Sequence, residues 1–408
     1  MTLRTRLRPA LPFVLVLALA ACQSTAPPQP ASGPMPSRAT STADVGALAQ
    51  QIVGTADVQP GELVFVYGGQ HTTPLLEAIM IASNRRGGRT LAVYDTDAAQ
   101  RAFWTDVPEE YLTQRIPFAD VAELADVYIG LPSLEDPTVL DDIPEDRFAL
   151  RQAQNAALQR EIMGYKFRGV FVSDPTEAEA ADVRLPYAEY ARQHRAALAA
   201  DYDAIARSAQ RVASALQGAD RIRVTTPAGT DLAFGTGRYE PRLNDGRISD
   251  AERASGGVLS RFVNLPGGSV EIAGVETSAE GRVVVPKADC RGGLLRDVRF
   301  RFAGGRMTGF EAGQGADCFE AVMAPYSGPK DRFGFLSVGL NPGRSVVEAD
   351  GAEYRPSDAA GMVYLTVGDN GYLGGANKGT AGYGFPLTNA TVEADGEVIV
   401  RDGRLVGM

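Results

Sequence analysis

The chain has 408 residues, 44% of them apolar and 22% charged, and its formal net charge is −10. Its length suits two domains, each large enough to bury its own core. The acidic balance, with no basic stripe to offset it, argues against a nucleic-acid partner and against docking on anionic lipid through protein charge. The 45 glycines and 25 prolines predict many tight turns and short strands.

Residues 1–22 are predicted to be a bacterial lipoprotein signal peptide. Three arginines precede an apolar run at 11–21 that is too short to span a bilayer. The run ends at Cys22 after two alanines, as at an acylation site; the alternative is an ordinary cleaved signal followed by an unrelated cysteine. Gln23 in the next position favours the outer membrane. We therefore expect an outer-membrane lipoprotein, held by acyl chains on Cys22 and facing the periplasm.

Residues 23–43 are rich in Pro, Ser, Ala and Thr and are predicted to form a disordered tether, because they cannot bury enough surface to fold. An α/β domain is expected at 44–217, where apolar runs alternate with helical patterns, as in a parallel sheet with helical crossovers. Its strands are predicted at 63–67, 90–94, 127–131 and 169–173, all buried on both faces. Its helices are predicted at 45–53, 75–84, 97–104, 153–165 and 187–216.

A β-rich domain is expected at 218–408, where short alternating strands are separated by glycine turns. Its strands are predicted at 221–225, 231–234, 282–285, 294–302, 363–367 and 392–400, and one helix is predicted at 316–323. Cys290 and Cys318 are left as an even pair in an exported protein, which favours a disulfide between them; the alternative is two buried thiols.

The segment at 261–281 is predicted to form a strand, a glycine turn and a second, half-buried strand. It closely resembles a segment of the aminopeptidase S/T family of metallo-aminopeptidases. The match within this segment centres on 264–268, and other matching stretches occur in the family's order at 58–62, 226–232, 339–343 and 367–370. The resemblance covers about 45–406. It implies an N-terminal α/β domain, a C-terminal β-rich aminopeptidase T-like domain, and a homodimer formed through the β-rich domain.

That family holds two divalent ions, such as zinc or cobalt, on Glu, His and Asp side chains, and the ions activate water for peptide hydrolysis. In this chain the resemblance puts other residues at the ligand positions: Ser269, Ser337, Tyr364, Gly382 and Gly384. No histidine follows His194 in the sequence. Hydroxyl groups are poor ligands for these ions and glycine offers no side chain. The same missing histidines argue against an iron site of the kind that the related dihydroxypyridine dioxygenases use.

A ligand site with altered lining is therefore expected near these positions, in a cleft between the two domains. The candidate binding residues are Ser269, Glu271, Glu276, Ser337, Asn341, Tyr364, Asp369, Asn370 and Tyr372. Tyr372 lies one residue away from the family's catalytic tyrosine. A glycine-rich loop at 374–384 is either a mobile lid or a loop released from constraint. His71 and His194 are expected to be solvated surface residues.

These observations predict a non-catalytic binding or scaffold protein for peptides or small molecules that carries no cofactor. One alternative is a metal-dependent aminopeptidase with unconventional ligands that binds zinc or cobalt. A calcium or magnesium site built from carboxylates is another, and so is a hydrolase that works without metal.

Overall fold

The computed structural model describes residues 42–407 with short gaps, so the predicted signal peptide and nearly all of the tether lie outside the described residues. The predicted helix at 153–165 falls in the longest gap. The gaps are at 116, 137, 141, 145, 149, 151–164, 166, 256–258, 291–292, 325, 350, 352 and 381. Among the described helices, none is long and apolar enough to cross a bilayer.

The described chain divides into two compact units, and the division differs from the expected boundary after residue 217. Unit 1 runs to Asp174 and also contains Ile248–Leu265, whereas unit 2 contains Pro175–Arg247 and everything from Pro266 onward. The chain leaves the parallel sheet at Asp174 and returns to it later as one further strand. The helices after Asp174 therefore group with the β-rich part of the chain.

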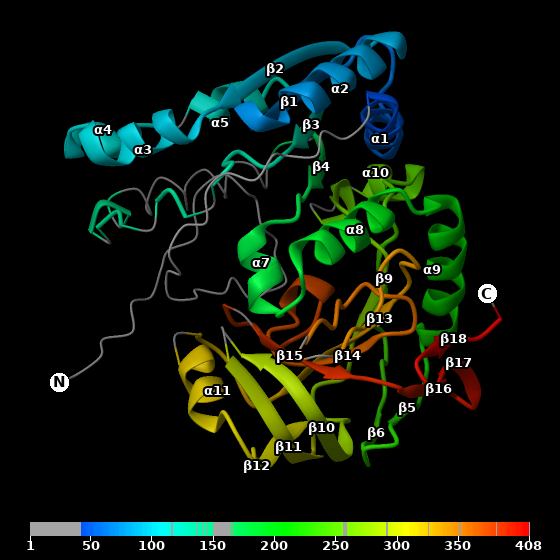
Figure 1. Ribbon diagram of the computed structural model, residues 1–408. Coiled ribbons are helices and arrows are strands. Elements are labelled where there is room, and N and C mark those ends of the chain that lie inside the picture. Colours follow the sequence, from blue (N-terminus) through cyan, green and yellow to red (C-terminus); the bar gives the residue numbers. More distant parts are fainter. Residues whose placement is uncertain are drawn as a thin grey trace. The chain divides into compact units, whose positions relative to one another are not determined.

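Unit 1 is built on a parallel sheet with the strand order β2-β1-β3-β4-β8 (Figure 1). The strands are β1 (Leu63–Gly69), β2 (Arg89–Asp95), β3 (Val127–Gly130), β4 (Arg168–Val172) and β8 (Phe262–Leu265). The helices are α1 (Thr42–Thr55), η1 (Gln70–Thr72), α2 (Thr73–Arg85), α3 (Asp97–Asp106), α4 (Glu109–Leu112), α5 (Pro117–Ala122), α10 (Asp250–Ser255) and η2 (Leu259–Arg261). The predicted α/β architecture is confirmed.

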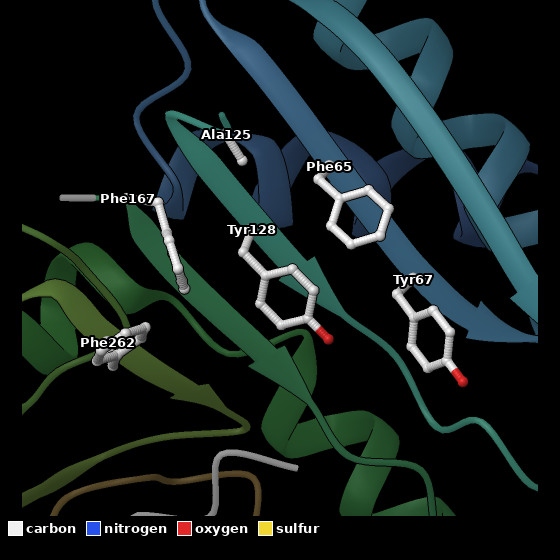
Figure 2. Close-up of a cluster of buried hydrophobic side chains, with 6 residues drawn as sticks. All are labelled: Phe65, Tyr67, Ala125, Tyr128, Phe167 and Phe262. Atoms are coloured by element: carbon white, nitrogen blue, oxygen red, sulfur yellow. The ribbon is translucent and has the colours of Figure 1, made fainter. Parts of the chain in front are cut away.

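An aromatic cluster fills one face of this sheet (Figure 2). Phe65, Tyr67, Tyr128, Phe167 and Phe262 are all buried there. Phe65 and Tyr67 are two residues apart on β1 and therefore point to the same face. Phe262 comes from β8, which pairs in parallel with β4. The predicted strand pair at 261–281 is thus divided between the two units, since the chain turns at a Pro-Gly-Gly sequence and enters a different sheet as β9 (Ser269–Ala273).

The expectation that residues 90–94 form a strand buried on both faces is wrong. β2 is an edge strand, and its side chains are exposed or half-buried along its whole length. Leu91, Val93 and Tyr94 keep 42%, 41% and 55% of their surface exposed. A continuous apolar run looks the same in the sequence whether the strand is central or at the edge, and only the strand order separates the two cases.

Unit 2 begins with α7 (Glu177–Asp182), followed by α8 (Tyr187–Leu198) and α9 (Tyr202–Leu216). One uninterrupted helix was expected at 187–216, and the structure corrects this. Asp201 lies between α8 and α9, and its side chain accepts a hydrogen bond of 3.0 Å from the backbone N–H of Ala204. An Asp that satisfies a backbone donor in this way begins a new helix.

Two antiparallel sheets make up the rest of unit 2. The eight-stranded sheet has the order β12-β11-β10-β6-β5-β16-β17-β18 and the five-stranded sheet has the order β15-β14-β13-β9-β7. The strands of the first are β5 (Ile222–Thr225), β6 (Asp231–Phe234), β10 (Glu280–Cys290), β11 (Gly293–Ala303), β12 (Arg306–Glu311), β16 (Thr391–Ala394), β17 (Glu397–Arg401) and β18 (Arg404–Leu405). Besides β9, the second contains β7 (Arg242–Asn244), β13 (Phe333–Gly339), β14 (Val363–Gly368) and β15 (Gly382–Leu387).

The core of unit 2 lies between these sheets. Phe333 of β13 contacts Phe302 of β11 and Phe234 of β6, with ring centroids 5.6 and 4.5 Å apart. The predicted helix at 316–323 is present as α11 (Ala316–Met323), and η3 (Gly371–Leu373) follows β14. The predicted disulfide between Cys290 and Cys318 is confirmed and joins β10 to α11.

Candidate functional site

Four of the candidate positions lie on one face of the five-stranded sheet. Ser337 of β13 is paired directly with Glu271 of β9 on one side and with Tyr364 of β14 on the other. Arg242 of β7 is paired with Glu271 and continues the row. Residues directly opposite each other on neighbouring strands point to the same face. We call Arg242, Glu271, Ser337 and Tyr364 the site row; Ser269 lies beside it, two residues before Glu271 on β9.

The opposite face of the same strands is apolar. Val270, Ile272, Leu336, Val338 and Leu365 alternate with the site-row positions and have no exposed surface. The alternation expected for β9 is therefore present. The expectation that this strand is half-buried is wrong, because Ser269 and Glu271 are also buried, at 7% and 5% exposure.

Glu271 is a buried carboxylate with two partners. Arg242 Nη1 lies 3.4 Å from its Oε2, and the hydroxyl of Tyr372 donates a hydrogen bond of 3.1 Å to the same oxygen. The Arg242 guanidinium also lies 5.9 Å from the centre of the Tyr372 ring. Burial raises the pKa of Glu271, although Arg242 and Tyr372 act in the other direction. Burial, together with the nearby Glu271 charge, raises the pKa of Tyr372.

Tyr364 is the last residue of the site row, at the end opposite Arg242, and Gly384 lies next to it on β15. The Tyr364 hydroxyl donates a hydrogen bond of 2.7 Å to the backbone oxygen of Arg355. Gly384 of β15 lies beside the ring, and a Cβ atom at this position would be 3.0 Å from Cδ1 of Tyr364. Gly382 comes two residues earlier on β15 and is paired with Gly368. A Cβ atom at 384 would thus be in tight contact with the Tyr364 ring, which would have to shift by a few tenths of an ångström.

Glu276 and Asn370 fix the start of the glycine-rich loop. Glu276 Oε1 accepts hydrogen bonds from the backbone N–H of Ala376, at 2.6 Å, and from Asn370 Nδ2, at 3.2 Å. Tyr239 donates to the same carboxylate at 2.9 Å. Burial acts to raise the pKa of Glu276. The hydrogen bonds that its carboxylate accepts, from Ala376 and also from Tyr239 and Asn370, outweigh the effect of burial, so the pKa is lowered. Asn370 and Glu276 therefore hold the loop.

The later part of the loop is also fixed at defined points. Asp369 Oδ1 accepts from the backbone N–H of Gly379 at 2.8 Å. Asn377 is 5% exposed, and its Nδ2 donates to the backbone oxygen of Phe333 at 2.8 Å. The carboxylates of Asp369 and Glu276 therefore both accept hydrogen bonds from backbone N–H groups of this loop. These contacts agree with neither of the two descriptions expected for the loop, a mobile lid or a segment without constraint.

Asn341 is fully buried two residues beyond the end of β13, and its side chain bonds to backbone groups. Its Nδ2 donates to the backbone oxygens of Ala197, at 3.1 Å, and Gly267, at 2.7 Å. Its Oδ1 accepts from the backbone N–H of Gly343 at 2.8 Å. All three bonds connect backbone segments of unit 2, so this side chain has a structural role.

His194 is not solvated as expected. It is 2% exposed on α8, and its Nδ1 lies 3.2 Å from Nη2 of Arg344. Arginine can only donate, so this ring nitrogen is the acceptor. His71 is half-buried in η1 of unit 1. In the described part of the chain, no three His, Cys, Asp or Glu side chains lie close enough together to hold a metal ion.

Two residues that matter for the site row were missed from the sequence. Arg242 lies on β7, a strand of three half-buried residues. This strand has no alternation of apolar and polar residues from which it could be predicted. Arg355, whose backbone oxygen binds Tyr364, lies outside any helix or strand. Its side chain has no exposed surface and contacts the carboxylates of Asp289, Glu348 and Glu353. A buried arginine in a loop leaves no periodic signal.

A family profile described as thermophilic metalloprotease (M29) matches residues 42–338. The α/β unit and the β-rich unit, with the site row on a sheet of the latter, agree with that assignment. The chain therefore belongs to the thermophilic metalloprotease family, as the aminopeptidase resemblance predicted. A search of curated proteins gives no match.

Two solved structures share the fold. AmpT from Thermus thermophilus is 16% identical with a TM-score of 0.61, over 89% of this chain and 99% of its own. The 2,5-dihydroxypyridine dioxygenase from Pseudomonas putida KT2440 is 17% identical with a TM-score of 0.57, over 91% of this chain and 99% of its own. At this level of identity the likeness establishes the fold alone, since unrelated functions occur on one fold.

Proposed function

We propose that this protein is a non-catalytic member of the family that binds peptides or small molecules on the face that carries the site row. Metallopeptidase activity requires ligands that can hold divalent ions. The side chains of the site row do not fit a pair of such ions as ligands. They offer one carboxylate, on Glu271, and the hydroxyls of Ser337 and Tyr364, whereas the guanidinium of Arg242 is a cation and cannot bind a metal ion. The site row therefore lacks the ligands that a metal-dependent step needs.

The observation that carries this proposal is the packing of Tyr364 against Gly384. The resemblance places Tyr364 at one ligand position of the family and the last ligand pair within residues 382–385. Here the edge of the aromatic ring lies 3.0 Å from the position of a Cβ at 384. That distance is tighter than ordinary van der Waals contact, so a ligating side chain at 384 would need Tyr364 to move.

The environment of Glu271 supports the same conclusion. Its carboxylate is paired with Arg242 and accepts a hydrogen bond from Tyr372. A guanidinium beside the carboxylate supplies the compensating positive charge and would repel a divalent cation at that position.

The chemistry that remains suits recognition. Arg242, Tyr364 and Tyr372 are half-buried and keep part of their surface accessible. A guanidinium and aromatic rings with hydroxyl groups bind carboxylate, amide and apolar groups, which are the features of a short peptide. We therefore take a peptide with a free carboxylate as the probe for this face.

The test combines metal content, hydrolysis and binding on the full chain. After exposure to zinc, cobalt or magnesium and dialysis, we expect substoichiometric metal and no chelator-sensitive turnover of Leu- and Arg-linked chromogenic substrates. Calorimetry should detect binding of the tripeptide Leu-Gly-Gly. Arg242→Lys keeps the charge beside Glu271 but loses the planar donors, so it should weaken that binding about tenfold.

Arg223→Lys is the matched control, because Arg223 forms an exposed pair with Asp231 on the other sheet. It should leave tripeptide binding unchanged. Two ions per chain together with hydrolysis that a chelator abolishes and metal restores would reject the proposal in favour of an aminopeptidase with unconventional ligands. Absence of both turnover and tripeptide binding would reject the peptide-binding role.

We also propose that the protein is an outer-membrane lipoprotein of the cell envelope. The arginines, the apolar run and Cys22 support this, together with Gln23. In cells that carry the full chain, labelled palmitate should be incorporated and the protein should sediment with outer membranes. Cys22→Ser should abolish both, whereas Cys290→Ser should leave the labelling intact. Labelling that persists in the Cys22→Ser chain would contradict the anchor.

A further inference from the structure

β2 is an unusual edge strand for a parallel sheet. Parallel strands are normally covered on both faces, and exposed edges are commonly protected by Lys, Pro or a bulge. The seven residues of β2, RTLAVYD, contain no Lys or Pro, the pairing with β1 has no bulge, and the charged residues Arg89 and Asp95 stand only at the two ends. Leu91, Val93 and Tyr94 are each more than two-fifths exposed. Among the described strands, β1 is the one neighbour of β2, and Figure 1 shows β2 at the end of the sheet.

The backbone of β2 has a defined outward-facing set of polar groups. Arg89 donates its N–H toward the β1 side, to the backbone oxygen of Glu62 at 2.8 Å. Successive residues of a strand direct their backbone groups alternately to the two sides. The N–H and C=O groups of Thr90, Ala92 and Tyr94 therefore point away from β1 and can pair with another strand.

The sequence of β2 is complementary to itself in the antiparallel direction. A two-fold axis through Ala92 places it opposite the partner's Ala92, and Thr90 opposite the partner's Tyr94. These are the residues with outward-facing backbone groups, so the hydrogen-bonded pairs of an antiparallel ladder fall on them. The same register places Arg89 opposite the partner's Asp95, which brings opposite charges together at both ends.

The exposed apolar side chains also match in this register. Leu91 falls opposite the partner's Val93, and both lie on the sheet face that carries Phe65 and Tyr67, their neighbours on β1. The aromatic cluster of Figure 2 would then continue across the axis into the second copy. Asp95 accepts hydrogen bonds from Tyr67, at 3.2 Å, and from Gln100, and this register places its carboxylate opposite Arg89 of the partner subunit.

We propose that two copies of this chain associate through β2, in antiparallel register about Ala92, to form one continuous ten-stranded sheet from the two five-stranded ones. This surface belongs to unit 1 and differs from the β-rich domain through which the resemblance predicted a homodimer. The pairing does not depend on the proposed binding function.

Sedimentation of the full chain tests the pairing. At micromolar concentration the native chain should be a dimer or a larger oligomer with an even number of chains. The double variant Leu91→Lys/Val93→Lys sets ammonium groups against each other across the axis and should raise the dissociation constant about 100-fold or more. Leu124→Lys, at a 71% exposed position of unit 1, should leave association unchanged. A native monomer, or a double variant that associates like the native chain, would overturn the proposal.

A cross-link tests the register itself. Hydrogen-bonded antiparallel pairs have Cα atoms about 5.5 Å apart, within the range that a disulfide spans. In a Cys22→Ser background, Ala92→Cys should therefore give a covalent dimer on mild oxidation, whereas Leu124→Cys should not. Equal cross-linking at the two positions, or none at position 92 in a dimeric chain, would exclude an axis at Ala92.

Discussion

Replacing Arg355 by Met is expected to lower the free energy of unfolding of unit 2 by about 3–5 kcal/mol. The side chain of Arg355 has no exposed surface and is surrounded by the carboxylates of Asp289, Glu348 and Glu353, the last of which is 4% exposed. Methionine fills a similar volume but leaves these carboxylates without their shared cation. Lys287, 3.0 Å from Glu353, compensates only one of them.

Thermal and urea unfolding of the full chain, followed by circular dichroism, measure this effect. Arg223→Met is the matched control, because Arg223 and Asp231 form a pair with 44% and 46% of their side-chain surface exposed. Exposed pairs contribute about 0–1 kcal/mol. Adding Glu353→Gln to Arg355→Met should recover part of the loss, since it removes one buried charge. Similar losses in the Arg355 and Arg223 variants would show that burial of the network is unimportant.

Replacing Asn341 by Ala is expected to lower the free energy of unfolding by about 3 kcal/mol, because it leaves buried backbone groups without partners. The amide of Asn341 connects the end of α8 at Ala197 with the turn at Gly267 that precedes β9. Gly268 packs against it: a Cβ at Gly268 would lie 2.8 Å from that of Asn341. Denaturant unfolding of the full chain measures the loss.

Asn341→Asp separates the structural role from a ligand-binding one. The carboxylate keeps an acceptor for the N–H of Gly343 but cannot donate to the two carbonyl oxygens, so Asp should destabilise more than Ala. The folded fraction of either variant should bind Leu-Gly-Gly with native affinity. A stable Asn341→Ala chain that no longer binds the tripeptide would return Asn341 to the ligand site.

Much of the fold could be predicted from local patterns. The helix at Ala316–Met323 has the predicted bounds, because an apolar period of helical spacing lies between glycine-rich turns. The predicted first strand coincides with most of β1. The helix break at Asp201 was missed, since the apolar period continues through it and only the capping hydrogen bond reveals a new start. The edge position of β2 was missed because burial depends on strand order.

The candidate site was predicted only in part. Ser269, Ser337 and Tyr364 were found through the resemblance, and the strand register brings them to one face. Asn341, Asp369 and Asn370 were expected in the same site, but their side chains hold backbone segments in place. A polar residue in a turn has the same sequence signal whether it meets a ligand or a backbone group.

By itself the sequence determined the two kinds of architecture, the cysteine pair and the family, because periodicity, turn residues and motifs are local properties of the chain. The tertiary structure decided which residues compensate Glu271, where the units divide, and which strand lies at the open edge. Arg242 and Tyr372 are 29 and 101 residues from Glu271 in the chain. Such contacts arise only when distant segments pack together, so no local pattern specifies them.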